Sequence, residues 1–138
     1  MSQERFDLIH RVNEARDRGD VDSMLEALTE DVVVDASRRV LDPFVAEGHE
    51  GFRRFIAVLD EAWVNQRLEP EEFIEAGDDV VVVPVRLVST GRGSGVVVNA
   101  RAAWAVTFRE DKIARLCVYQ TRAEALEAVG LPAQADSA

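Results

Sequence analysis

Few residues of this chain belong to the types that most often carry out chemistry. Its 138 residues include two histidines, His10 and His49, and one cysteine, Cys117. Glu50 follows His49, but no further His or Cys is present to complete a zinc site. Cys117 lies in the strand-like pattern KIARLCVYQ, where a small buried hydrophobic side chain is the simplest interpretation. We therefore expect no metal site and no cofactor.

The glycines of STGRGSG form the other candidate motif. Gly91, Gly93 and Gly95 resemble a phosphate-binding loop only in composition, because the Walker lysine motif and the helix that should follow it are both missing. Strand-like sequence flanks the motif on both sides. We interpret it as a long hairpin connection between two strands.

Composition argues against two classes of partner. The formal net charge is -10, which disfavours nucleic acid, because phosphate backbones are bound through Lys and Arg. Wholly apolar runs extend over only a few residues, against roughly 20 for a membrane span, so no membrane partner is expected. The beginning of the sequence, MSQERFD, is charged rather than apolar, so we expect a cytoplasmic protein. The 47% hydrophobic content is enough for one domain with its own core.

Helical periodicity occurs three times in the first half. A first helix carries an apolar stripe and ends at Arg18-Gly19. Asp20 is a good N-cap for a second helix with the apolar positions Val21, Met24, Leu25 and Leu28. A third helix begins near Gly48 to Gly51, with the predicted buried positions Phe52, Phe55, Ile56, Leu59 and Trp63. Between the second and third helices, residues 32–34 are three valines typical of a short strand, and residues 39–48 have turn chemistry.

The second half predicts strands. From Arg67 to Leu131 it contains one extended run, three long strands in succession and a short final helix. Helices followed by an antiparallel meander indicate an α+β fold. Residues 80–83 and 96–98 are consecutive valines, so both faces of the sheet are apolar there. We expect the helices to cover one face and a second copy of the chain to cover the other, in a homodimer through the outer sheet face.

Several segments together resemble a known family. They are RGDVDSMLEALTEDVVV, GHEGFRRF, PEEFIEAGDDVVVVPVRL, GRGSGVVV and VTFREDKIARLCVYQTRAEALEAVGL. Over Phe6 to Leu131 the chain looks like a SnoaL-like protein of the nuclear transport factor 2-like superfamily, which includes ketosteroid isomerase and limonene epoxide hydrolase. This superfamily contains enzymes, binding modules and scaffolds, so the resemblance is specific for fold rather than for function.

The resemblance implies an α+β, cone-shaped roll. A curved antiparallel or mixed β-sheet would wrap around three N-terminal helices, followed by a short C-terminal helix. One domain would span residues 1–131, with a flexible tail at 132–138. A pocket would lie at the wide end of the cone, and dimerisation would occur across the sheet.

The same match bears on catalysis. It places the oxyanion tyrosine of ketosteroid isomerase at Val12, its general base at Ala36 and its protonated aspartate at Trp104. All three chemical groups are missing, so that mechanism is disfavoured. Asp35, one residue before Ala36, would face the pocket only if a bulge reversed the alternation of the strand. It is the candidate catalytic carboxylate of the chain. The Asp-Arg-Asp set of an epoxide hydrolase is not found around Arg101.

The match also implies a mostly apolar pocket for a flat apolar or aromatic ligand with an acidic or carbonyl end. Arg16 and Arg38 would either bind that end or extend over the rim, and Trp104 would be either core or pocket wall. The implied ligand-binding residues are Val12, Arg16, Arg38, Phe55, Trp63, Val83, Val85, Ala102, Trp104, Leu116, Val118 and Gln120, with Ala36 beside them.

Three functions remain open at this point. The first is a pocket protein that binds a small hydrophobic ligand without turning it over. The second is a cofactor-free isomerase, cyclase or hydratase that uses Asp35 as an acid or base, with an arginine stabilising an oxyanion. The third is a dimeric scaffold whose cone is filled by its own side chains, Trp63 and Trp104 among them.

Overall fold

The computed structural model describes residues 2–38 and 43–133. The helices in these residues are α1 (Ser2–Asp17), α2 (Val21–Glu26), α3 (Gly48–Ala62) and α4 (Arg122–Ala128). The strands are β1 (Leu28–Ala36), β2 (Phe44–Glu47), β3 (Trp63–Pro70), β4 (Ile74–Ala76), β5 (Val80–Gly91), β6 (Val97–Arg109) and β7 (Lys112–Tyr119). Most of the expected tail at 132–138, and residues 39–42 of the expected turn, lie outside the described residues. None of the described helices is long and apolar enough to cross a membrane.

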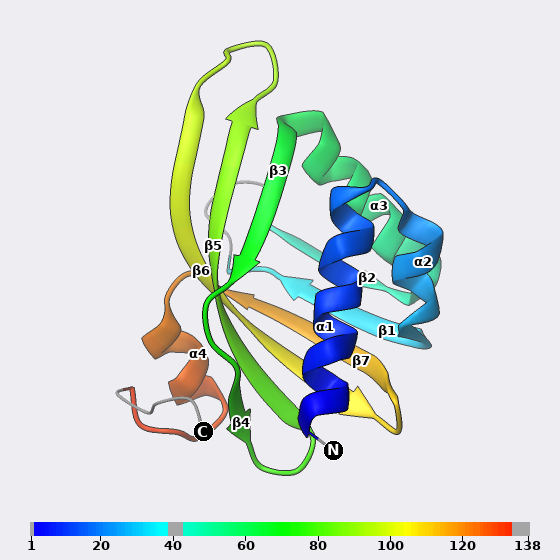
Figure 1. Cartoon of the computed structure of the whole chain (residues 1–138), viewed down its shortest axis with the longest axis vertical. Helices are drawn as coiled ribbons and strands as arrows, with labels where there is room; N and C mark the ends of the chain where they lie inside the picture. The colour runs from blue at the N-terminus through cyan, green and yellow to red at the C-terminus, as the bar shows by residue number, and fades with distance from the viewer. Residues whose placement is uncertain (1, 39–42, 134–138) are drawn as a thin grey trace.

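One curved sheet organises the molecule. Its strand order is β2-β1-β7-β6-β5-β3, and β4 pairs with β5. β1 is parallel to β7, and the other pairs are antiparallel. Figure 1 shows α1, α2 and α3 on the concave side of the sheet and α4 on the opposite side. The expected α+β roll with a curved, mixed sheet around three N-terminal helices is therefore confirmed.

The turn between α1 and α2 and the start of α2 agree with the sequence prediction. Gly19 has a φ of +72°, a conformation that glycine adopts without steric cost. Asp20 caps α2 by accepting a hydrogen bond from the Ser23 backbone N–H at 3.1 Å. The prediction that Leu28 lies on this helix is wrong. The helix ends at Glu26, and the carbonyl of Ala27 accepts a bond from Ile113 N–H, which draws the chain into the sheet.

The buried face of α3 is largely as predicted. Phe52, Phe55, Ile56 and Leu59 are buried at helical spacing. The expectation that Trp63 continues this face is wrong, because its φ of −130° and ψ of 143° are extended and it begins β3. The short strand β2 was not predicted, since its pairing with β1 brings together residues from two separate segments.

Apolar side chains are buried on both sides of the sheet. The larger core lies between the concave face and α1, α2 and α3. A smaller core on the outer face packs Val82 and Cys117 against Leu126 of α4. Cys117 is buried, as predicted. The argument that a second copy must cover the valines at 80–83 is wrong for Val82, because the chain's own helix covers it.

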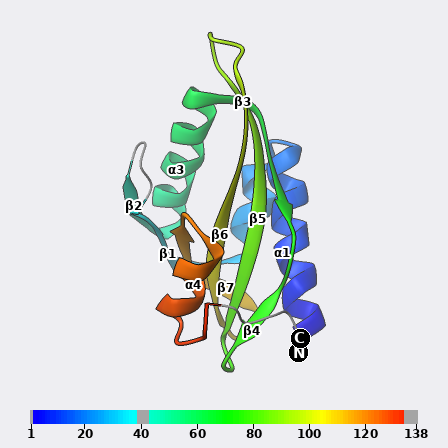
Figure 2. The same cartoon turned by 90° about the vertical axis from the view of Figure 1, so that its left-hand side faces the viewer.

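The β5–β6 hairpin extends beyond the helices. Figures 1 and 2 both show its tip projecting from the same end of the molecule. Here Val96, Val97 and Val98 are 60%, 65% and 37% exposed. The glycine-rich segment forms the turn of this hairpin, as the sequence predicts. These valines, together with Val45 of β2 at 59%, are apolar surface that the described part of the chain leaves exposed.

The outer core gives a prediction for stability. Leu126 is fully buried, whereas the neighbouring Glu127 is exposed. Leu126→Ala should lower the free energy of unfolding by about 2–5 kcal/mol, because it leaves a cavity beneath α4. Glu127→Ala should change it by less than about 0.5 kcal/mol. Urea denaturation followed by circular dichroism measures both, and equal stability of the two variants would show that α4 contributes little to the core.

Candidate functional site

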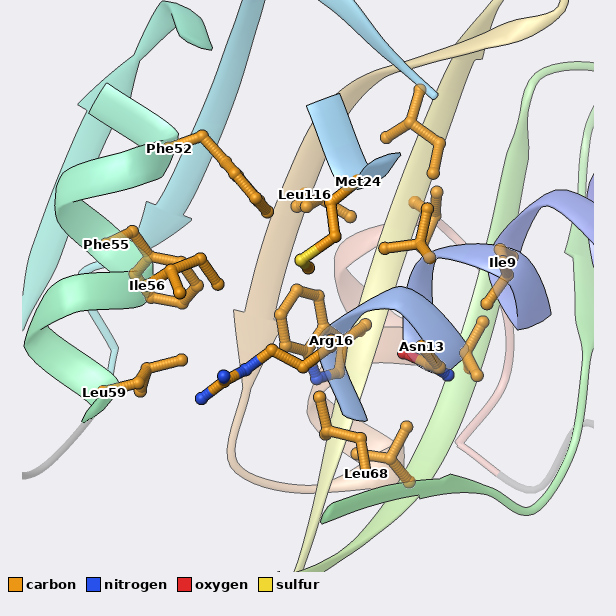
Figure 3. A pocket seen from close by; sticks show the side chains of 16 residues that line it. Ile9, Asn13, Arg16, Met24, Phe52, Phe55, Ile56, Leu59, Leu68 and Leu116 are labelled. Carbon is orange, nitrogen blue, oxygen red and sulfur yellow. The ribbon is translucent and has the colours of Figure 1, made fainter. Parts of the chain in front are cut away.

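A cavity lies between α1, α3 and the concave face of the sheet. The space that the centre of a water molecule can occupy is about 60 Å³, and the empty space is about 610 Å³ when the part open to solvent is included. A single water molecule needs roughly 10–15 Å³ of the first kind of space, so the cavity is several times larger than a single water site. Figure 3 shows side chains of the two helices facing each other across the space. The described lining residues are Ile9, Val12, Asn13, Arg16, Met24, Phe52, Phe55, Ile56, Leu59, Leu68, Val83, Val85, Trp104, Val106, Ile113 and Leu116.

The periodicity of the elements explains how these residues meet. On α1, Ile9, Asn13 and Arg16 follow one another at i, i+4 and i+7, so they share one helix face. On β5, alternate residues point to the same side of the sheet, which brings Val83 and Val85 into the cavity. Trp104 pairs with Val83 across β5 and β6 and shares that face. Each of these elements therefore contributes the side chains of one of its faces to the cavity wall.

Arg16 is the only charged residue among the described residues that line the cavity. Its side chain is only 11% exposed. Figure 3 shows it extending from α1 into the space toward Leu59 of α3. One terminal nitrogen lies 3.0 Å from Oδ1 of Asp60, whose side chain is 55% exposed. The Nε atom is buried and has no hydrogen-bond partner. The arginine thus carries one satisfied ion pair and one unsatisfied donor.

Two more donors belong to the same wall. The side-chain amide of Asn13 and the indole N–H of Trp104 make no hydrogen bond with other described residues. Both side chains are half-buried. An indole N–H and an arginine Nε can only donate, while the amide can also accept. The polar groups of this otherwise apolar cavity therefore favour a ligand group that accepts hydrogen bonds.

The structure places Asp35 on the outer face of the sheet. Val34 and Ala36 on either side of it are buried in the inner core, and the irregularity in β1 lies before Val33, so Asp35 is not turned inward. Asp35 therefore does not line this cavity, and the inward turn on which its catalytic role depends is not seen in β1.

The contacts of Asp35 are those of a surface ion pair. Its Oδ1 accepts a hydrogen bond from the Ser37 hydroxyl at 2.6 Å, and Arg115 lies 3.3 Å from its Oδ2. The Ser37 bond holds the pKa of Asp35 below its ordinary value, and Arg38 and Arg115 act in the same direction. This carboxylate is held ionised on the outer face.

The other predicted ligand-binding residues divide into two groups. The cavity wall includes Val12, Arg16, Phe55, Val83, Val85, Trp104 and Leu116. The wall does not include Ala36, Arg38, Trp63, Ala102, Val118 and Gln120. Ala36 and Val118 are buried in the inner core, and Ala102 packs against it. Trp63 lies at the start of β3.

Arg38 and Gln120 are outside the cavity because their strands end before them. β1 ends at Ala36, so the inward alternation does not reach Arg38. Its guanidinium lies over the Tyr119 ring, 4.9 Å from the centroid. β7 ends at Tyr119, and the exposed Gln120 donates a hydrogen bond to the Arg38 carbonyl. Neither of these two side chains lines the cavity.

Sequence reasoning missed several wall residues, of which Asn13 is the most informative. Its spacing from Ile9 and Arg16 on the first helix could have identified it. Met24 and Leu68 were missed for a different reason. Met24 comes from the short helix α2 and Leu68 from the edge strand β3, and only the packing of these elements brings them to the cavity.

Comparison with known proteins places this geometry in a wider group. No curated protein sequence matches the chain. Among solved structures, TerC co-crystallised with polyporic acid is 22% identical and has a TM-score of 0.76, covering 91% of this chain and 98% of its own. A Catenulispora acidiphila protein with a ketosteroid isomerase-like fold, in complex with trimethylamine, is 16% identical, with a TM-score of 0.73 and coverages of 93% and 95%. A Mycobacterium tuberculosis protein in complex with estradiol-17beta-hemisuccinate is 17% identical, with a TM-score of 0.72 and coverages of 86% and 94%.

These identities are too low to carry over function, but they support the fold. The sequence profile of the SnoaL-like domain matches residues 9–116, which is most of the chain. The matched range includes the second half of α1, all of α3, and the strands of the cavity as far as Leu116 of β7. The chain belongs to the SnoaL-like domain family.

Proposed function

We propose that this protein binds an apolar or aromatic metabolite with an acidic or carbonyl end in the cavity between α1 and α3. The observation that carries the proposal is the buried Nε of Arg16, which has no acceptor in an otherwise apolar space. Leaving a buried donor unsatisfied costs about 1–3 kcal/mol. An oxygen atom of a ligand would satisfy this donor, and the apolar walls would bury the rest of the molecule.

The shape and chemistry of the wall support an aromatic ligand. Phe52 and Phe55 from α3 and Trp104 from β6 contribute rings to it. Aliphatic side chains from α1 and the sheet supply the remaining contacts. Aromatic rings pack favourably against a flat ligand at offset or edge-to-face geometry. Two of the similar folds, those solved with polyporic acid and with estradiol-17beta-hemisuccinate, also hold small organic molecules.

The geometry favours binding over acid–base catalysis. A general acid or base must lie within hydrogen-bond reach of the substrate. Among the described wall residues there is no Asp, Glu, His, Cys, Lys or Tyr, and Asp35 lies on the outer face. The scaffold alternative is disfavoured by the space that remains between α1, α3 and the sheet, and by Trp63, which does not line it.

Binding can be tested with a panel of bicyclic aromatic ketones, quinones and carboxylates by isothermal titration calorimetry. We expect dissociation constants on the order of micromolar for members of the panel, as apolar burial of this kind allows. Arg16→Met should weaken binding by roughly tenfold, because it removes the donor while keeping the aliphatic stem.

Arg11→Met is the matched control, since Arg11 is an exposed arginine of the same helix. Its affinities should equal those of the wild-type protein. Equal affinities in Arg16→Met and wild type would show that the arginine does not bind the ligand. No binding across the panel would contradict the proposed function.

We further propose that the protein forms a homodimer through the outer sheet face. Val45 and Val97 are 59% and 65% exposed. Val45 pairs with Asp35, and Val97 lies an even number of residues before Ala103 of the outer core on β6, so both valines point to that face. Exposed apolar side chains on a strand favour association, and a twofold axis would place the same patch of both copies in contact.

The dimer can be tested with two variants of one strand. Val97→Lys should shift the protein toward monomer in sedimentation equilibrium, because it buries a charge in the interface. Val98→Lys should leave the dimer intact, since successive residues of a strand point to opposite faces. A monomeric wild-type protein, or equal disruption by both variants, would argue against this interface.

A further inference from the structure

We infer that the cavity selects a neutral carbonyl group over a carboxylate, and that Asp60 determines this preference. The inference rests on the proposed function and narrows its ligand class. It starts from the ion pair that Arg16 forms before any ligand is present, with 3.0 Å between its terminal nitrogen and Asp60 Oδ1. The charge of the cavity arginine is therefore already balanced by the protein.

The cavity has one positive charge, and a negative charge lies beside it. Arg16 is the only charged side chain among the described lining residues, and Asp60 lies in contact with it at the end of α3. A ligand carboxylate would add a second negative charge beside one guanidinium. Like charges within a few ångströms disfavour each other, and the carboxylate would also lose its water in an apolar space.

A carbonyl oxygen meets the same donors without this cost. The free Nε of Arg16 needs an acceptor, and acceptance of a hydrogen bond does not require a charge. The Asn13 amide and the Trp104 N–H lie on the same wall and also lack partners among the described residues. A ketone, quinone or ester oxygen can accept a hydrogen bond from donors of this wall without adding a charge. The ligand class is a flat apolar molecule with a neutral carbonyl end.

Asp60 acts here as a specificity-determining residue and not as a ligand contact. Its side chain is 55% exposed, so water screens part of its charge, and the effect on affinity is moderate. The rest of its negative charge acts on the guanidinium of Arg16, whose side chain is only 11% exposed. That charge lowers the affinity of the cavity for a ligand carboxylate. Without the negative charge of Asp60, the guanidinium would be free to balance a ligand carboxylate.

The test compares three probes that share one ring system: methyl naphthyl ketone, naphthoate and naphthamide, each substituted at the same ring position. We expect the wild-type protein to bind the ketone and the amide at least about fivefold more tightly than naphthoate in calorimetric titrations. Asp60→Asn should raise the affinity for naphthoate by about fivefold and change that for the ketone by less than about twofold.

Glu61→Gln is the matched control, because Glu61 is the exposed neighbour of Asp60 and does not line the cavity. It should leave all three affinities unchanged. The comparison of naphthamide with naphthoate needs only wild-type protein, so it tests the preference for a neutral carbonyl even when Asp60→Asn does not fold.

The outcomes separate the two levels of the proposal. Tighter binding of naphthoate than of naphthamide by wild type, or an unchanged preference in Asp60→Asn, would overturn the carbonyl inference and leave the binding function intact. If none of the three probes nor unsubstituted naphthalene binds, the aromatic pocket itself is contradicted, and the inference fails with it.

Discussion

The alternation of side chains along the long strands is the constraint on which this structure depends. β5, β6 and β7 are apolar on both faces over much of their length, so each face needs a cover. The N-terminal helices bury the concave face, and α4 buries part of the outer face. Among the described residues, large apolar side chains stay exposed at Val96 to Val98 of the projecting hairpin and at Val45 of β2. The positions of the cavity and of the proposed dimer surface both follow from this division.

The cavity exists because two helices and a curved sheet cannot fill all the space between them. α1 and α3 each present one face to the sheet, and their side chains meet across the opening. Most of the wall is aliphatic or aromatic, so water inside it would have few partners. The single arginine breaks this pattern. Its aliphatic stem packs against the wall while its head reaches Asp60 at the margin.

That arginine determines what the site can do. A guanidinium stays protonated and has no acceptor, so it can bind or stabilise an oxygen but cannot abstract a proton. The carboxylate that would have supplied a base, Asp35, is instead held between Ser37, Arg38 and Arg115 on the opposite face. Asp35 and Ala36 are neighbours on β1, and successive residues of a strand point to opposite faces. A carboxylate at position 36 would face the inner core, whereas Asp35 forms ion pairs on the outer face.

The sequence by itself determined most of the elements and part of the cavity wall. Local periodicity identified the buried face of α3, the Asp20 cap and the hairpin turn, because these depend on neighbours within a few residues. Together with the family resemblance, it also predicted Val83, Val85 and Trp104 on one face. Tertiary structure alone decided where the strands end, and this end point keeps Arg38 and Gln120 out of the wall. It also decided which charged side chains pair with each other. The Arg16–Asp60 contact joins two helices that are distant in the sequence, and the unpaired Nε is a consequence of that packing, which no local pattern records.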